Sequence, residues 1–239
     1  MPKMIDPLAL EAAARVALAN IAVEIKALVS HRNEYSPEGL AMRVEQIQSK
    51  HAPALQKVAA DIDTLEKAIE AMPEFWHAQA YPPLPTGGAD RLAVEMEVSR
   101  LMARPAPGSA ESIRAMLPTL WGTPTAAVYV DEVKVRDETA ALTIVTVEAE
   151  QDSWREMETV KSALTTHLNN VLSHLRREAV EAATGEVIKE ALRAGGGAPA
   201  FLDETAALVG GDAILTRGER VYDTGKYSYS FTKKKEEMN

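Results

Sequence analysis

The chain has 239 residues, a formal net charge of −9 and no cysteine. This length is sufficient for one sizeable domain or two small ones, and a hydrophobic content of 46% is enough to build a core. The absence of cysteine excludes disulfides, thiolate catalysis and thiolate metal sites. The acidic excess argues against a nucleic-acid binder that uses its whole surface, because neutralising phosphates requires an excess of Lys and Arg.

The hydropathy pattern indicates a soluble globular protein. No apolar run approaches the roughly 18 residues that a membrane span requires, and the first five residues lack the apolar region of a signal peptide. We therefore expect a cytoplasmic location, or a virion location if the protein comes from a phage. Aromatic residues make up only 5% of the chain while alanine is abundant, which favours packed helices over a large β core.

The N-terminal third predicts two helices that fold back on each other. Asp6-Pro7 and Ser36-Pro37 are helix starts, because an oxygen side chain caps free N–H groups and proline tolerates the first turn. The first helix, ending near Arg32, carries an apolar stripe at helical spacing. With so short a connection, we expect an antiparallel hairpin. The stripe of the first helix contains Leu18, Ile21, Ile25 and Leu28.

The second helix is predicted to break at Pro53 and then to resume with coiled-coil spacing. Its spacing is maintained over about two and a half heptads, which is too short for a free-standing coiled coil. The favoured interpretation is a core within one chain, and the alternative is a seam between subunits. This second stripe consists of Leu55, Val58, Ile62, Leu65, Ile69 and Met72.

A proline- and glycine-rich connector at 81–88 is the predicted boundary after the hairpin, and short helices are expected at 90–102 and 110–117. The next segment predicts a β-ribbon, with arms at 127–136 and 141–148 joined by a turn at 137–139. Both arms are rich in β-branched residues, which suit a pleated, half-buried surface. Two strands alone are marginal in water, so the ribbon requires a further strand, a helix or a neighbouring subunit.

A long helix is predicted after the ribbon, opened by a capping box at Ser153 and Glu156 and ended by the glycines at 195–197. Gly185 is expected to kink or end this helix. The remaining chain predicts an extended arm with short strands. The predicted interface residues on the ribbon and this arm are Tyr129, Val133, Val135, Ile144, Val145, Val147, Tyr222, Tyr227, Tyr229 and Phe231.

The predicted fold class is therefore α+β and predominantly α-helical, with an N-terminal antiparallel helical hairpin, a central β-ribbon followed by a long helix, and an extended C-terminal arm with short strands. The predicted parts are 1–80, 81–194 and 195–239.

No catalytic, cofactor-binding or metal-binding residue is predicted. The glycines of 218–226 do not have phosphate-loop spacing. His167 and His174 share one helix face, but seven residues place their rings about 10 Å apart, too far for one ion. Four acidic residues are interpreted as a solvated tip of the ribbon: Asp131, Glu132, Asp137 and Glu138. In a second alternative, the protein is an enzyme of unrecognised type and these carboxylates are its acid–base or metal-binding groups.

The resulting functional hypothesis is a non-enzymatic structural subunit that assembles with copies of itself and with other structural proteins of the same assembly. This architecture is similar in character to phage virion components such as head-to-tail connector rings. The alternative is a helical nucleic-acid-associated dimer that binds through the basic tail residues Lys233, Lys234 and Lys235.

Overall fold

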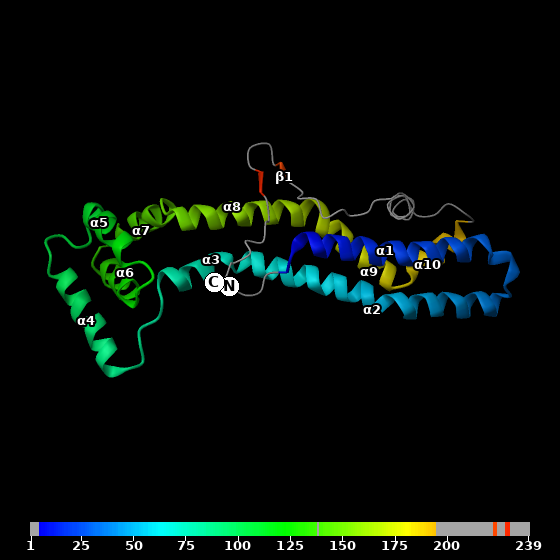
Figure 1. The fold of residues 1–239 in the computed structure, drawn as a ribbon, viewed down its shortest axis with the longest axis horizontal. Coiled ribbons are helices and arrows are strands. Elements are labelled where there is room, and N and C mark those ends of the chain that lie inside the picture. The colour runs from blue at the N-terminus through cyan, green and yellow to red at the C-terminus, as the bar shows by residue number, and fades with distance from the viewer. Residues whose placement is uncertain (1–4, 138, 195–221, 224–227, 230–239) are drawn as a thin grey trace, which may run out of the picture. The chain divides into compact units, whose positions relative to one another are not determined.

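The computed structural model describes residues 5–137, 139–194, 222–223 and 228–229. Its helices fall into two compact units. The long-helix unit contains residues 5–66 and 165–194, and the short-helix unit contains residues 67–137 and 139–164. The helices α2 and α8 each contribute to both units (Figure 1). The three-part division predicted from the sequence stays a prediction.

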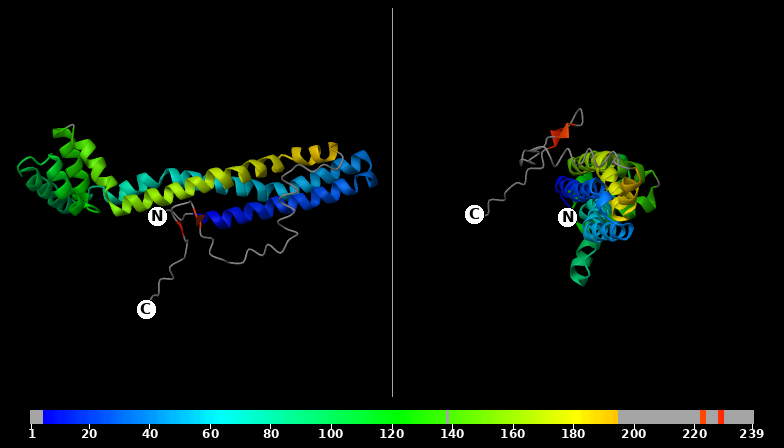
Figure 2. Two further views of the ribbon diagram at one scale, coloured as in Figure 1. Left: turned by 90° about the horizontal axis from the view of Figure 1, so that it is seen from above. Right: turned by 90° about the vertical axis from the view of Figure 1, so that its right-hand side faces the viewer.

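The long-helix unit is built from the N-terminal hairpin and the end of the described helical chain. In it α1 packs on α9 and α10, and α1 and α2 form the predicted hairpin (Figures 1 and 2). Its elements are α1 (Pro7–Ser30), the 3-10 turn η1 (Arg32–Glu34), α2 (Pro37–Glu70) up to residue 66, the end of α8 (Asp152–His167), the π-helical turn η2 (Leu168–Leu172), α9 (Ser173–Ala183) and α10 (Glu186–Arg193).

The start of α1 follows from local chemistry, as predicted. The Asp6 Oδ1 atom accepts hydrogen bonds from the backbone N–H groups of Leu8 (3.0 Å) and Ala9 (3.4 Å), and Pro7 occupies the first turn. The predicted stripe of this helix is buried, with Ile21 and Ile25 at 0% exposure.

The predicted break of α2 at Pro53 is wrong, because α2 is continuous through this residue. Proline in a helix interior removes one hydrogen bond and costs roughly 3 kcal/mol. Apolar side chains on both sides of Pro53 are buried, including Ile47 at 2% and Leu55 at 0% exposure. The free energy gained by burying one continuous apolar stripe along α2 outweighs the cost of Pro53 in the helix. Because Ile62 and Leu65 are also buried within the chain, this stripe is intrachain core and not a seam between subunits.

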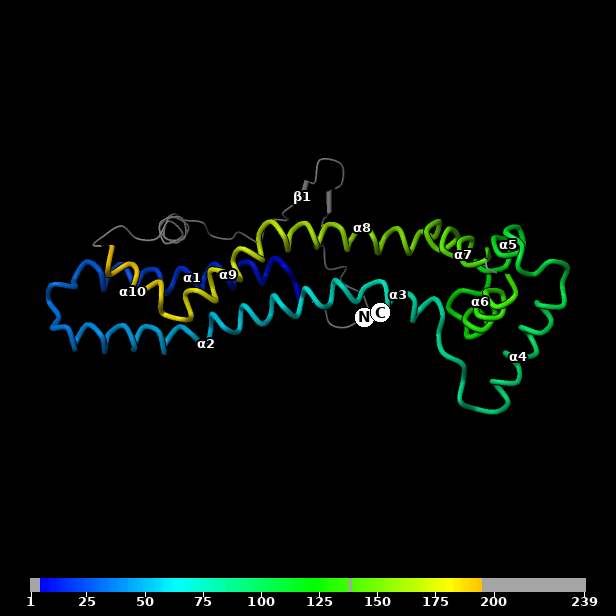
Figure 3. Tube along the Cα trace, turned by 180° about the vertical axis from the view of Figure 1, so that it is seen from behind, coloured from blue at the N-terminus to red at the C-terminus, as the bar shows by residue number. Residues whose placement is uncertain are grey.

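The predicted long helix is interrupted twice. The π-helical turn η2 joins α8 to α9, and Gly185, with φ at +75°, separates α9 from α10. The helices α8, α9 and α10 follow one another along the trace (Figure 3). Glycine adopts this left-handed conformation without steric cost, so the predicted helix end at Gly185 is confirmed. The predicted capping box is not formed: α8 begins at Asp152, and the Ser153 hydroxyl accepts a hydrogen bond from Trp76 Nε1 at 3.2 Å.

The short-helix unit surrounds a core of its own. In this unit α5 packs against α7, and α4 packs against α6. The core residues are Val98, Leu101, Met102, Ile113, Leu117, Tyr129, Val130, Val133, Ala140, Ile144 and Val147. The helices are α3 (Met72–Ala80), α4 (Gly88–Met102), α5 (Ala110–Leu120), α6 (Pro124–Arg136), α7 (Ala140–Ala149) and most of α8.

The predicted β-ribbon is wrong, and so is the α+β fold class, because both of its arms are helices, α6 and α7. The buried residues Ala126, Tyr129, Val130 and Val133 follow helical spacing, and Pro124 occupies the first turn of α6. Packing of these side chains against α4 and α5 overrides the β preference of valine and threonine. The turn itself is retained: the Asp137 Oδ1 atom accepts hydrogen bonds from Thr139 N (2.9 Å) and Thr139 Oγ1 (2.7 Å).

In the C-terminal arm, the structure describes two short strands, β1 (Tyr222–Asp223) and β2 (Ser228–Tyr229). They pair antiparallel with Tyr222 opposite Tyr229. Among the described residues, no helix combines the length and the apolar character needed to cross a membrane.

Candidate functional site: the outer face of α1

The residues of α1 that are exposed as whole residues share one property: none of them carries a charge. The Arg15 side chain, which lies beside them, is 40% exposed. A helix at the surface of a soluble protein ordinarily turns charged and polar residues outward. We call the complete set of exposed residues in this helix the outer face of α1: Ala9, Ala13, Val16, Asn20, Val23, Ala27 and Ser30.

The outer face of α1 follows the spacing of a helix–helix seam. Steps of four and three residues alternate from Ala9 to Ser30 without interruption, which is the a/d pattern of a coiled coil. Its largest side chains, Val16 and Val23, are 54% and 51% exposed. The chain therefore presents an uncharged and mainly apolar strip, with Asn20 at its middle, along three heptads of one helix.

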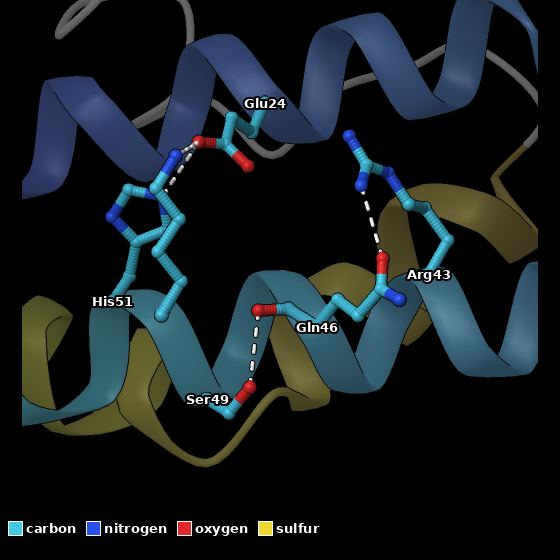
Figure 4. A network of polar contacts seen from close by, with 6 residues as sticks. Glu24, Arg43, Gln46, Ser49 and His51 are labelled. Carbon is cyan, nitrogen blue, oxygen red and sulfur yellow. Dashed lines mark hydrogen bonds and ion pairs between the residues drawn. The ribbon is translucent and has the colours of Figure 1, made fainter.

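The four charged residues of α1 lie beside or behind this face and are half-buried or buried. The Glu24 Oε1 atom accepts a hydrogen bond from Lys50 Nζ and lies 3.0 Å from His51 Nε2, and both partners are on α2 (Figure 4). The hydrogen bond from Lys50, opposed by burial and helped by His51, holds the pKa of Glu24 below its usual range. These contacts attach the charged flank of α1 to α2.

A second charged group lies on the side of α1 that faces α8. The Glu11 carboxylate is 8% exposed, accepts a hydrogen bond from Arg15 Nε at 2.8 Å and lies 3.4 Å from His167 Nε2. Burial lowers the pKa of His167, while Glu11 opposes this shift and Arg15 adds to it. His167 immediately precedes the π-helical turn η2.

The short-helix unit has an apolar outer surface of its own. The helix α7 has no charged residue between Ala140 and Val147, yet it exposes Leu142 by 75% and Val145 by 58%. Val135, near the end of α6, is 86% exposed. We call Leu142 and Val145, which lie three residues apart on one helix, the α7 patch.

The three tryptophans of the chain gather within the short-helix unit, together with His77 and Tyr81. The Trp76 and Trp154 rings meet edge to face at 4.7 Å, and the His77 ring lies 5.4 Å from Trp154. Trp121 Nε1 lies within hydrogen-bonding range of the Tyr81 hydroxyl, at 3.5 Å. This cluster joins the ends of α3 and α5 to the start of α8.

A short hydrogen bond anchors the cluster to α7. The Tyr81 hydroxyl donates to the Glu148 carboxylate at 2.6 Å, and Glu148 is 8% exposed. Burial, reinforced by this carboxylate, raises the pKa of Tyr81 well above its usual range. A phenol held protonated in this way acts as a donor that fixes Glu148 rather than as a base. The cluster is therefore a structural junction.

The sequence-predicted interface residues are divided between core and surface. Tyr129, Val133, Ile144 and Val147 are buried in the core of the short-helix unit, whereas Val145 belongs to the exposed α7 patch and Val135 is exposed on α6. Tyr222 and Tyr229 lie on the paired strands β1 and β2. The other predicted contacts, Tyr227, Phe231, Lys233, Lys234 and Lys235, lie outside the described residues.

The candidate chemical groups of the sequence do not converge. His174 Nε2 pairs with Glu178 Oε1 at 3.0 Å on the surface of α9, while His167 lies beside Glu11. Asp131 and Glu132 are exposed on α6. Across the described ranges, no three His, Asp or Glu side chains come close enough together to hold a metal ion.

The sequence interpretation missed the outer face of α1. Its signal was the absence of charge at positions spaced four and three residues apart over 22 residues, on the side of the helix opposite the stripe of large apolar residues. Comparison of the chain with family models, curated proteins and solved structures found no match in any of the three.

Proposed function

We propose that this protein is a non-enzymatic structural subunit that assembles with copies of itself through the outer face of α1. The observation that carries the proposal is the composition of that face: all exposed positions of a 24-residue helix are uncharged and follow heptad spacing. Contiguous exposed apolar surface on a soluble protein marks an interaction site. Full burial of one valine contributes about 1.5 kcal/mol or more, and a pair of subunits would bury four here.

The α7 patch supports an assembly larger than a dimer. A two-fold contact between identical faces closes on itself and yields only a dimer, so a larger assembly requires a second, different surface on each subunit. The α7 patch supplies such a surface in the other unit, with Leu142 and Val145 exposed side by side at three-residue spacing.

The mode of assembly differs from the one expected from the sequence. The predicted arms 127–136 and 141–148 are helical and offer no strand edges, so strand addition through that ribbon is not part of the proposal. The narrower hypothesis of a head-to-tail connector depended on that ribbon and loses this support. The nucleic-acid alternative depends on Lys233, Lys234 and Lys235, which lie outside the described residues. A cytoplasmic or virion location remains part of the proposal.

The solution mass of the full chain tests the proposal. We expect light scattering after size exclusion to give a mass that rises with concentration above the 25.9 kDa of one chain. A mass of one chain at every concentration up to the solubility limit would contradict self-assembly.

A further inference from the structure

The order of residues along the outer face of α1 is nearly the same when read in either direction. From Asn20 outward, each side presents a valine, then an alanine, then a small residue: Val16, Ala13 and Ala9 toward the N-terminus, and Val23, Ala27 and Ser30 toward the C-terminus. Asn20 is the only amide on the face and lies at its middle.

This symmetry suits a two-fold contact between antiparallel helices, because it places residues of equal size opposite one another. In such a contact a residue i of one copy touches a residue j of the other, and j of the first touches i of the second, so a single patch must be complementary to itself. Turning α1 end over end near Asn20 places Val16 beside Val23, Ala13 beside Ala27 and Ala9 beside Ser30. In a parallel pair each residue lies beside the same residue of the partner, whatever the order of residues along the helix.

We infer that the outer face of α1 binds the same face of a second copy in an antiparallel arrangement, with the two-fold axis passing close to Asn20. The inference rests on the proposed function and adds the identity and the direction of the partner helix. Val16 then lies beside the partner's Val23, and Ala13 lies beside the partner's Ala27.

The residue sizes and charges fit this contact. The alanines leave room for the two backbones to approach closely, and the valines supply the apolar contact on each side of the axis. The face carries no charge, so no group meets its own like charge across the axis. A carboxamide both donates and accepts hydrogen bonds, so the two Asn20 side chains can pair, and a single asparagine in an apolar seam fixes its register.

The absence of cysteine from the chain makes a direct test available. Ala13 and Ala27 are separated by 14 residues, about 21 Å along a helix, whereas a disulfide joins Cα atoms only about 4.4–6.8 Å apart. We would express the full-length A13C and A27C variants separately and together, oxidise each sample mildly and measure the covalent mass. Circular dichroism would first establish that each variant keeps the helical content of the parent chain.

The expected result is a covalent dimer of twice 25.9 kDa in the co-expressed sample, with each variant alone staying at the single-chain mass. Covalent dimers from A13C alone and A27C alone would show parallel pairing and overturn the inference, although the protein would still self-assemble. The absence of a covalent dimer in all three samples, from a protein that is oligomeric by light scattering, would place the contact elsewhere and would also overturn it. A single-chain mass before oxidation would contradict the proposed function itself.

Discussion

Two stripes with the same heptad spacing run along the helices of the long-helix unit, and they have opposite environments. The stripe of α2 contains leucine, isoleucine and valine and is buried, with Leu55 and Ile62 at 0% exposure. The outer face of α1 contains alanine, valine, asparagine and serine and is exposed. Heptad spacing by itself therefore does not distinguish intrachain core from an external face. The size of the side chains does, since large apolar groups bury the most area when the chain folds.

The two stripes should respond differently to substitution, and the largest expected effect is on the stripe of α2. Ile62→Ala should lower the free energy of unfolding by about 2–5 kcal/mol, because it removes buried methyl groups and leaves a cavity. Chemical denaturation followed by circular dichroism measures this change. The mass of the folded variant should stay that of the parent assembly; dissociation at concentrations where the variant is fully folded would mean that the stripe of α2 also contributes to the interface.

The outer face of α1 should show the converse behaviour. The double variant V16E/V23E places unpaired carboxylates in the proposed seam, and we expect the dissociation constant to rise by at least about 100-fold because burying such groups costs several kcal/mol. Sedimentation velocity measures this change. The free energy of unfolding of one chain should change little, since both side chains are already exposed.

A matched control for this variant is available on α2. Met42 is 62% exposed, so M42E introduces a carboxylate at an equally accessible apolar position outside the outer face of α1. Association of M42E should equal that of the parent chain. If M42E and V16E/V23E weakened association equally, the added negative charge would explain the loss, and the outer face of α1 would not be the interface.

Substitution in the tryptophan cluster of the short-helix unit should have an effect of intermediate size on the free energy of unfolding. Tyr81→Phe removes the donor at 2.6 Å from the Glu148 carboxylate and leaves a buried acceptor less well satisfied. We expect a loss of about 1–3 kcal/mol in the free energy of unfolding. The change should appear in tryptophan fluorescence, because all three tryptophans lie in this unit. Tyr35→Phe, at a residue that is 41% exposed, serves as the control and should leave both measurements unchanged.

The smallest expected effect concerns pH and the charged side of α1. Burial lowers the pKa of His167 in the folded protein, so the unfolded chain binds a proton more readily near the ordinary histidine pKa of about 6.5. The stability contribution of neutral His167 is therefore complete above that pH and declines as the pH falls below it. A carboxylate with a lowered pKa in the folded protein, such as Glu24, also stabilises the fold, but this contribution is lost only as the pH falls below about 4.5.

Denaturation at pH 7.5 and pH 5.5 separates these contributions. The parent chain should be less stable at the lower pH, and His167→Gln should reduce that difference because glutamine does not titrate. His31→Gln is a suitable control, since the side chain of His31 is 59% exposed. An equal pH dependence in the parent and His167→Gln proteins would show that His167 does not couple folding to protonation.

Local sequence signals determined where several helices begin and end. The Asp6-Pro7 start of α1, the Ser109 cap of α5 and the glycine stop at Gly185 depend on a few neighbouring backbone and side-chain groups. These signals act within one turn of helix, so they can be read without knowledge of the rest of the fold. The hairpin of α1 and α2 follows from the short connection between two such helices.

Tertiary packing decided the conformation of α6 and α7 and the orientation of α1. The predicted arms 127–136 and 141–148 have β-branched residues that suit strands, but their buried side chains share one core with those of α4 and α5 and follow helical spacing. In α1 both sides are apolar, so periodicity alone could not indicate which one faces inward. The pairing of Glu24 with Lys50 and His51, and of Glu11 with Arg15 and His167, joins the charged flanks of α1 to its neighbours and leaves the uncharged face outward.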